Sequence, residues 1–285
     1  MHINKKSRAA AGAFVVAILA GGTAACGSDS DSSDMSPAAA VKAASEKNEK
    51  ITSLSYKIKG TYPGQGKVEG AAQMSVKPAA MSMKLTTDTP GQPGEVEIIM
   101  VDEAMYLGGT PEAAEEMGGK RFLKMDLSGL DQAGKGAAGG PGKVPGQVGQ
   151  NPAAESGFLD GADDVKKIGT ATVEGEKTTQ YRGTVAVKDL RASLKDEKAE
   201  TRKQREKSLK QYEDLGVKNL TMDIWITEED RTKQFRMQGD TGQGKLDVTM
   251  TFGDVNKPVT VKAPPASEVM DLAEMMKDVE AEPAA

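Results

Sequence analysis

Residues 220–227 of the chain, LTMDIWIT, alternate apolar and polar side chains with a period of two. Leu220, Met222, Ile224 and Ile226 fall on one side of an extended chain, and the intervening residues fall on the other. Successive side chains of a strand point to opposite faces, so this pattern predicts a strand with one buried and one solvated face. That arrangement is typical of antiparallel sheets.

The same alternation recurs along most of the chain, and glycine, proline and acidic residues separate its segments. Such residues end strands and reverse the chain. We therefore expect about a dozen short antiparallel strands in two runs, with a tight turn at Asp102 and Glu103. The second run is expected to include strands at residues 165–174 and 178–188, and a short one at 259–261. Gly70 is expected to mark a bend or a bulge.

Two short helices are indicated by their capping residues and composition. The first is expected to begin with Ser36 as N-cap and Pro37 at the first helical position, and to run to about Lys50. The second is expected to carry Phe158 and Leu159.

Residues 188–215 contain no glycine or proline and are rich in Lys, Glu and Arg, which predicts one long charged helix. Its apolar residues lie near its two ends, so its middle, residues 195–208, is expected to be solvated. A last helix is expected to follow Ser267 as its N-cap. The apolar positions of that helix are Val269, Leu272, Met275 and Met276.

Low-complexity segments divide the chain further. Residues 129–152 consist almost wholly of Gly, Ala, Pro, Gln and Lys, which predicts a flexible loop. Residues 280–285 are expected to form a disordered tail. Residues 37–279 are then expected to form a single domain that contains this loop and the charged helix.

The N-terminal residues have the order of a secretory signal peptide. Lys5, Lys6 and Arg8 precede an uncharged run at residues 9–20, and small residues follow. The apolar part is too short to span a bilayer of about 30 Å stably. We therefore expect residues 1–25 to be removed.

Cys26 follows the small residues Ala24 and Ala25 directly. This order resembles the lipobox of bacterial lipoproteins, in which the thiol accepts a diacylglyceryl group. The alternative is a free or disulfide-bonded cysteine, but Cys26 is the only cysteine, so it has no partner for an intramolecular disulfide. Two or more acyl chains give stable anchoring. We expect Cys26 to be the lipid attachment site, and residues 26–36 to form a polar, flexible tether.

Charge and composition exclude several classes of function. The whole chain carries a net charge of −5, and residues 1–25 hold three cations and no acid, so the mature chain would carry −8. An acidic chain with few aromatic residues is a poor match to nucleic acid. The one histidine is His2, within the predicted signal, so the mature chain has no imidazole for a Ser-His-Asp triad, a Cys-His dyad or a His-ligated zinc site.

Several segments together resemble a known family. These are EVEIIMVDEAMYLGG with KRFLKMDL, KKIGTATVEGEKTTQYRGTV, NLTMDIWITEEDRTKQFRM and FGDVNKPVTVKAPPASEV. They are similar to segments of the LppX/LprAFG-type lipoproteins of actinobacteria, whose fold is similar to that of the lipoprotein carrier LolA. The resemblance implies an α+β fold in which a curved antiparallel half-barrel carries helices on its concave face, with an apolar cavity between them. It also implies binding or transport of lipids or lipoglycans.

The chain is methionine-rich, with 15 Met against five Phe, and methionine adapts to variable acyl chains. These residues are also compatible with an ordinary packed core. The predicted cavity-lining residues are Leu54, Tyr56, Ile58, Met74, Val76, Met81, Met83, Leu85, Ile98, Met100, Met222, Ile224, Val248 and Met250.

The sequence therefore predicts a membrane-anchored, extracytoplasmic lipoprotein that binds or carries a lipid or acylated ligand. It is expected to be a monomer without catalytic residues, cofactor, metal or nucleic-acid partner. The alternative is a tethered interaction or sensor module with a packed core and no ligand. A carboxylate-based enzyme is disfavoured because the acidic residues cluster in turns and on the charged helix.

Overall fold

The computed structural model describes residues 35–89, 92–110, 114–115, 117–126, 151–194 and 199–275. All of them lie in one compact unit of the chain, Met35–Ala285. Cys26, the predicted signal peptide, nearly all of the glycine-rich loop and the predicted C-terminal tail lie outside the described residues.

A single open, curved sheet of twelve strands dominates the described residues, in the order β12-β6-β5-β4-β3-β2-β1-β11-β10-β9-β8-β7. The first run comprises β1 (Ser53–Tyr62), β2 (Gly66–Ser75), β3 (Ala80–Thr89), β4 (Gln92–Val101), β5 (Ala104–Gly108) and β6 (Phe122–Asp126). The second comprises β7 (Lys166–Val173), β8 (Glu176–Ala186), β9 (Asn219–Thr227), β10 (Thr232–Thr241) and β11 (Gly244–Gly253). The last strand is β12 (Val269–Asp271).

Two meanders of antiparallel strands build this sheet, as the alternation predicts. They join where the first strand of one run, β1, pairs with the last strand of the other, β11. Only β12 and β6 among the paired strands run parallel. Asp102 and Glu103 form the turn between β4 and β5 with positive φ values of 53° and 59°.

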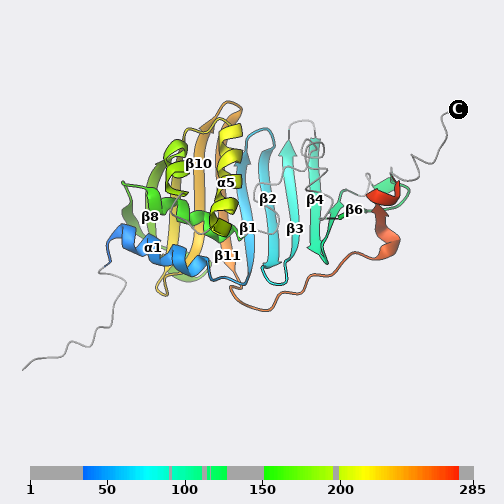
Figure 1. Cartoon of the computed structure of the whole chain (residues 1–285), viewed down its shortest axis with the longest axis horizontal. Helices are drawn as coiled ribbons and strands as arrows, with labels where there is room; N and C mark the ends of the chain where they lie inside the picture. The colour runs from blue at the N-terminus through cyan, green and yellow to red at the C-terminus, as the bar shows by residue number, and fades with distance from the viewer. Residues whose placement is uncertain are drawn as a thin grey trace, which may run out of the picture. The chain divides into compact units, whose positions relative to one another are not determined.

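The four longest described helices gather over one half of the sheet (Figure 1). They are α1 (Pro37–Asn48), the 3-10 helix η2 (Pro152–Gly161), α4 (Val187–Ser193) and α5 (Ala199–Asp214). Helices α1 and η2 contact β9 and β10, and α4 contacts β8 and η2. The predicted first helix is confirmed, because Ser36 caps it by accepting a hydrogen bond from the Ala39 N–H at 3.2 Å. We call the helix-bearing face of the sheet the inner face and the opposite one the outer face.

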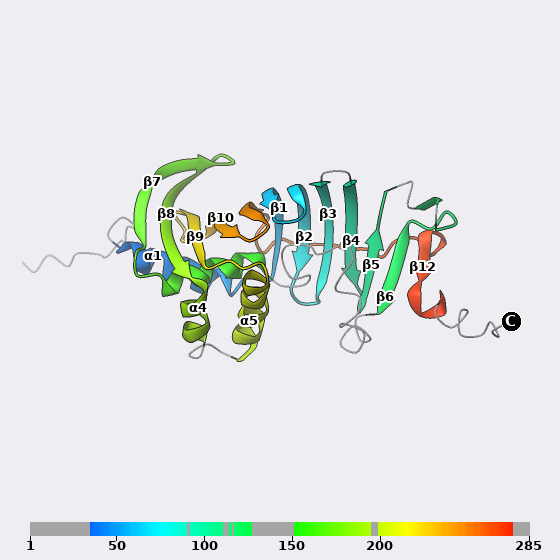
Figure 2. The ribbon, with the colours of Figure 1, turned by 90° about the horizontal axis from the view of Figure 1, so that it is seen from above.

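The single long helix predicted at residues 188–215 is wrong. Helices α4 and α5 lie side by side, and Arg191 of α4 pairs with Glu213 of α5 at 2.7 Å (Figure 2). A continuous helix rises about 1.5 Å per residue, so Leu190 and Tyr212 would lie roughly 33 Å apart. Arg191 and Glu213 are also 22 residues apart, so one continuous helix could not bring them into contact, whereas a helix pair does. The expected solvated middle is also wrong at Arg205 and Ser208, which are buried.

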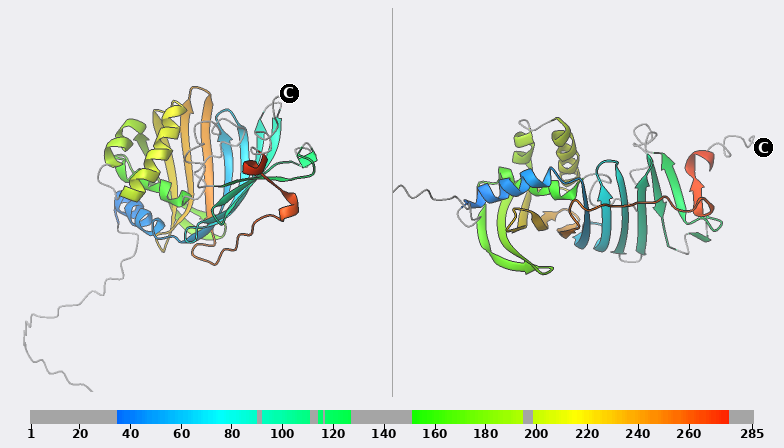
Figure 3. Two further views of the ribbon diagram at one scale, coloured as in Figure 1. Left: turned by 45° about the vertical axis from the view of Figure 1, so that its right-hand side comes forward. Right: turned by 90° about the horizontal axis from the view of Figure 1, so that it is seen from below.

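The C-terminal part also differs from expectation. Residues 259–261 form no strand, and the chain from β11 runs along one end of strands β1–β5 to reach β6 (Figure 3). Residues Ala266–Glu268 form a short 3-10 helix, η4, and β12 pairs with β6 where a helix capped by Ser267 was expected. Strand pairing satisfies backbone groups at the edge of the sheet. Only residues 272–275 are helical, and Met276 lies outside the described residues.

Gly70 marks no bulge, because the register of β2 with β1 and β3 continues unbroken through it. A Cβ atom at this position would lie 2.4 Å from the Lys84 carbonyl oxygen. Glycine therefore permits a close approach of β2 and β3.

Two apolar clusters fill the two sides of the sheet. The larger lies on the inner face and joins the strands to α1, η2, α4 and α5. The smaller lies on the outer face of β4–β6, where Ile99, Tyr106 and Phe122 pack with Val261 and Val269. The C-terminal segment therefore covers apolar side chains of β4, as well as supplying β12.

Candidate functional site

The residues predicted to line a cavity all lie on the inner face and belong to one apolar cluster. Thirteen are buried, and Val76 is partly buried. The register explains this convergence, since Met250 lies beside Ile58, and Met83 lies between Ala72 and Ile98. That these side chains contact a ligand remains a prediction.

Helical side chains cover part of this cluster. Phe158 and Leu159 from η2, Leu190 from α4, and Leu209 and Tyr212 from α5 are buried against it. The rings of Phe158 and Tyr212 meet edge to face, with centroids 6.4 Å apart, which is a favourable aromatic geometry. The short helix predicted around Phe158 and Leu159 is therefore confirmed, as a 3-10 helix.

A buried asparagine fixes η2 on the sheet. The Asn48 side-chain amide lies 2.8 Å from Ser156 Oγ, 2.7 Å from Thr232 Oγ1 and 3.2 Å from the Ala153 carbonyl oxygen. These contacts join α1, η2 and β10. Because buried amides are costly without partners, they hold η2 in one position.

Glu155, on the next turn of η2, is a polar group that the sequence did not single out. Its carboxylate accepts hydrogen bonds from Ser208 Oγ at 3.1 Å and from the Tyr212 hydroxyl at 3.0 Å. Burial raises the pKa of Glu155, while the two hydroxyl donors and the charge of Arg205 lower it by less. The raised pKa marks a carboxyl held in an apolar environment.

A small hollow lies beside this carboxylate. It measures about 20 Å³ and is bounded by α5, η2 and the strands β1, β10 and β11. Its lining residues are Tyr62, Glu155, Gln211, Tyr212, Met237, Leu246, Val248 and Met250. A space of this size holds about one water molecule. It is therefore far smaller than an acyl chain needs.

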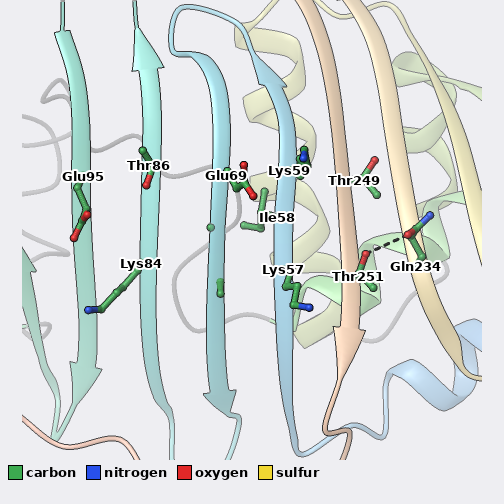
Figure 4. A pocket seen from close by; sticks show the side chains of 12 residues that line it. Lys57, Ile58, Lys59, Glu69, Lys84, Thr86, Glu95, Gln234, Thr249 and Thr251 are labelled. Carbon is green, nitrogen blue, oxygen red and sulfur yellow. Dashed lines mark hydrogen bonds between the residues drawn. The ribbon is translucent and has the colours of Figure 1, made fainter. Parts of the chain in front are cut away.

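The outer face bears a much larger hollow of about 860 Å³ across β10, β11 and β1–β4 (Figure 4). Its labelled side chains are almost all polar and include Lys57, Lys59, Lys84, Glu69 and Glu95. This hollow is open, and most of the side chains that border it end in ammonium, carboxylate, amide or hydroxyl groups.

Two of its lysines already have acidic partners. Lys57 pairs with Glu174 of the β7–β8 turn at 2.7 Å, and Lys84 pairs with Glu97 at 3.7 Å. The Glu174 contact forms because the β7–β8 hairpin curves over the outer face toward β1 (Figure 2). Exposed pairs of this kind are typical of an ordinary solvated surface.

The described part of the chain lacks two kinds of feature. It holds no group of three or more His, Cys, Asp or Glu side chains placed to bind a metal ion. It also holds no helix long and apolar enough to cross a membrane.

Comparisons with known proteins find two curated relatives and several solved structures that resemble this chain. No family model matches it. An uncharacterised 31.2 kDa protein of Streptomyces griseus is 30% identical over 197 residues, which cover 68% of this chain and 62% of that protein. A "Putative lipoprotein" of Streptomyces coelicolor is 24% identical over 181 residues, covering 64% and 53%. The chain thus spans less than two thirds of the length of either relative.

Two solved structures belong to the group that the sequence resembles. The crystal structure of LprF from Mycobacterium bovis matches with a TM-score of 0.48 at 14% identity, covering 81% of this chain and 97% of LprF. The structure of the Mycobacterium tuberculosis lipoprotein LppX matches with a TM-score of 0.44 at 14% identity, covering 79% and 98%. The chain is therefore similar to lipoproteins of the LppX/LprAFG type, as the sequence predicts.

Proposed function

We propose that the chain is an extracytoplasmic lipoprotein that binds a lipid or acylated ligand on the inner face of its sheet. The observation that carries this proposal is the continuous apolar cluster of that face. It extends from the helix-bearing strands β8–β10 to strands β2–β4. The curved sheet is proposed to be a LolA-like half-barrel.

The proposed attachment to the membrane is through Cys26. Residues 1–25 would be removed, the Cys26 thiol would carry a diacylglyceryl group, and residues 26–36 would tether the single domain at 37–279. This arrangement would place a monomer beside the outer surface of the cell membrane. It agrees with the lipoprotein description of the Streptomyces coelicolor relative.

Binding would depend on the hydrophobic effect. Each Å² of apolar surface removed from water contributes roughly 25 cal/mol, without a catalytic residue or a cofactor. Seven methionines belong to the inner cluster as buried residues, namely Met74, Met81, Met83, Met100, Met222, Met237 and Met250. Their unbranched side chains can change rotamer to fit an acyl chain. Because the hollow lined by described residues is only about 20 Å³, side chains or helices must move to admit one.

The small hollow favours a second candidate function. A chain with the same fold and a fully packed core would act as a tethered interaction or sensor module without a ligand. In that case the inner methionines would be structural residues only.

Two neighbouring alanines of β2 allow a matched test. Ala72 is buried on the inner face, and Ala71 is exposed on the outer face. We expect native mass spectrometry of the full-length chain, purified from bacterial membranes, to detect noncovalently bound lipid. Ala72→Leu should reduce the bound lipid by occupying space on the inner face, and Ala71→Leu should leave it unchanged.

Thermal unfolding of both variants controls for misfolding. Absence of bound lipid in a folded wild-type chain, even after incubation with a mixed lipid extract, would favour the packed-core alternative. Equal lipid loss in the two variants would place binding elsewhere.

A further inference from the structure

The hollow beside Glu155 has a polar rim and an apolar floor. Tyr62, Glu155, Gln211 and Tyr212 supply polar groups to it. Its floor consists of strand residues from β10 and β11, which are Met237, Leu246, Val248 and Met250. A site with this division suits the junction between the polar end and the apolar chain of one ligand.

Glu155 can accept a further hydrogen bond. Each of its carboxylate oxygens accepts one bond, from Ser208 and from Tyr212. An ionised carboxylate offers about four lone-pair sites, so acceptor capacity remains. The raised pKa of Glu155 supports this argument, because burial disfavours the charged form and a further donor would compensate it.

The rim also offers donors. Neither the Tyr62 hydroxyl nor the Gln211 side chain makes a hydrogen bond to another residue in the described part of the chain. Tyr62 is half-buried and Gln211 is exposed. Gln211 therefore lies at the solvent-facing end of the hollow. A ligand group that both donates and accepts, such as a hydroxyl, would satisfy the carboxylate and the tyrosine together.

Charge and size disfavour an anionic headgroup. A phosphate would lie against the Glu155 carboxylate, and like charges repel in a site of low dielectric. Arg205 interacts with Glu155 electrostatically, but its guanidinium stacks on the Phe158 ring at 5.7 Å and does not line the hollow. A hollow of about 20 Å³ accommodates a group the size of a water molecule, which fits a hydroxyl.

We propose that Glu155 and Tyr62 bind the hydroxyl end of a neutral lipid, such as a diacylglycerol, whose acyl chains lie on the inner face. This inference rests on the proposed lipid-binding function and adds a ligand class to it. Glu155 and Tyr62 would contact the ligand, and Ser208 would position the Glu155 carboxylate.

The test compares two lipids that share their acyl chains. The full-length chain is incubated with dioleoylglycerol or with dioleoylphosphatidylglycerol, and retained lipid is measured by native mass spectrometry. Mass released on denaturation separates this lipid from any covalent lipid on Cys26. The wild-type chain should retain dioleoylglycerol at least about tenfold more tightly, as expected when one charge-assisted hydrogen bond replaces a repulsion.

Three variants localise the effect. Glu155→Gln should weaken dioleoylglycerol binding about tenfold, and Tyr62→Phe should weaken it a few-fold. Glu206→Gln, at an exposed position of α5, should change nothing. Tyr62→Phe should also leave the melting temperature unchanged because its hydroxyl has no hydrogen-bond partner among the described residues, so a loss of binding there cannot come from misfolding.

Each other outcome counts against the inference. Equal retention of the two lipids, or unchanged retention in both Glu155→Gln and Tyr62→Phe, would overturn the headgroup site and leave lipid binding itself intact. Retention of neither lipid by the folded wild-type chain would overturn both the inference and the proposed function.

Discussion

Two neighbouring rows of side chains cross the same eight strands, from β8 to β4, and differ in almost every chemical property. The inner row is Tyr181, Ile224, Phe235, Met250, Ile58, Gly70, Leu85 and Val96. The outer row, one residue along each strand, is Arg182, Asp223, Arg236, Thr249, Lys59, Glu69, Thr86 and Glu95. Successive side chains of a strand point to opposite faces, so residues one position apart belong to an apolar interior and to an ionic surface.

The larger hollow lies on the outer face, opposite the large apolar cluster. The outer hollow of about 860 Å³ is walled by ammonium, carboxylate and hydroxyl groups, and the inner hollow of about 20 Å³ adjoins the apolar cluster. The chemistry of the lining therefore outweighs the volume when the two faces are compared as binding sites.

The largest expected effect comes from truncating the inner face. Met222 is fully buried, and its neighbour Thr221 is half-buried on the outer face of the same strand. Met222→Ala should lower the free energy of unfolding by about 2–5 kcal/mol through lost burial and a new cavity. Thr221→Ala should change it by less than about 0.5 kcal/mol. Guanidinium unfolding of the two variants measures both values.

Similar losses of stability in Met222→Ala and Thr221→Ala would contradict the expected difference between the inner and the outer face. A cost for Met222→Ala well below the expected range would indicate an inner face that collapses easily around a vacancy. That result would strengthen the proposal that the same face rearranges around an acyl chain.

Much of this contrast is predictable from the sequence because alternation is a local property. Met222, Ile224 and Ile226 have to share a face once residues 220–227 form a strand. The pairing of β1 with β11 joins residues about 200 positions apart, and no local signal specifies it. Strand β12 is too short for periodicity to reveal it, since it contains three residues.

The helical region was harder to predict for a related reason. Residues 188–215 have uniform helix propensity, and nothing in propensity marks where α4 ends and α5 begins. The signal that indicates two helices is the distance along the sequence between the apolar residues near Leu190 and those near Leu209. Both groups have to reach one core. Glu155 carries no comparable signal, because its partners Ser208 and Tyr212 belong to a different helix.

A smaller effect is expected within the ionic outer face. Asp223 accepts hydrogen bonds from Arg182 Nε at 2.8 Å and Gln180 Nε2 at 2.7 Å, and its side chain is 1% exposed. Asp223→Asn should destabilise the chain by about 2–3 kcal/mol, because it places an uncharged amide against Arg182. The matched variant Asp247→Asn should cost less than about 1 kcal/mol, since Asp247 pairs with Arg236 in a more exposed position. Equal costs in urea unfolding would show that burial does not govern these pairs.

The smallest effect is a difference in pH dependence between the faces. Burial raises the pKa of Glu155 above its usual 4.5, so its contribution to stability is complete below pH 4.5 and is lost as the pH rises through the folded-state pKa. The hydrogen bonds from Arg236 lower the pKa of Asp247 below its usual 3.8. Its contribution is present above pH 3.8 and is lost as the pH falls through the folded-state pKa.

The two carboxyl groups should therefore give opposite slopes. Glu155→Gln should flatten the decline in stability above pH 4.5, and Asp247→Asn should flatten the loss below pH 3.8. One proton changes the slope by at most about 1.4 kcal/mol per pH unit, and solvent screening reduces the effect at Asp247 further. Unfolding midpoints recorded across this range measure both slopes.

Four residues interact electrostatically with Glu155, namely Tyr56, Tyr62, Tyr212 and Arg205. Burial raises the pKa of each tyrosine, so none of the three tyrosines loses its proton in this pH range. A slope at Glu155 with the same sign as that at Asp247 would mean that its carboxylate is better solvated than the apolar floor of the hollow implies, and the proposed hydroxyl site would lose its physical basis.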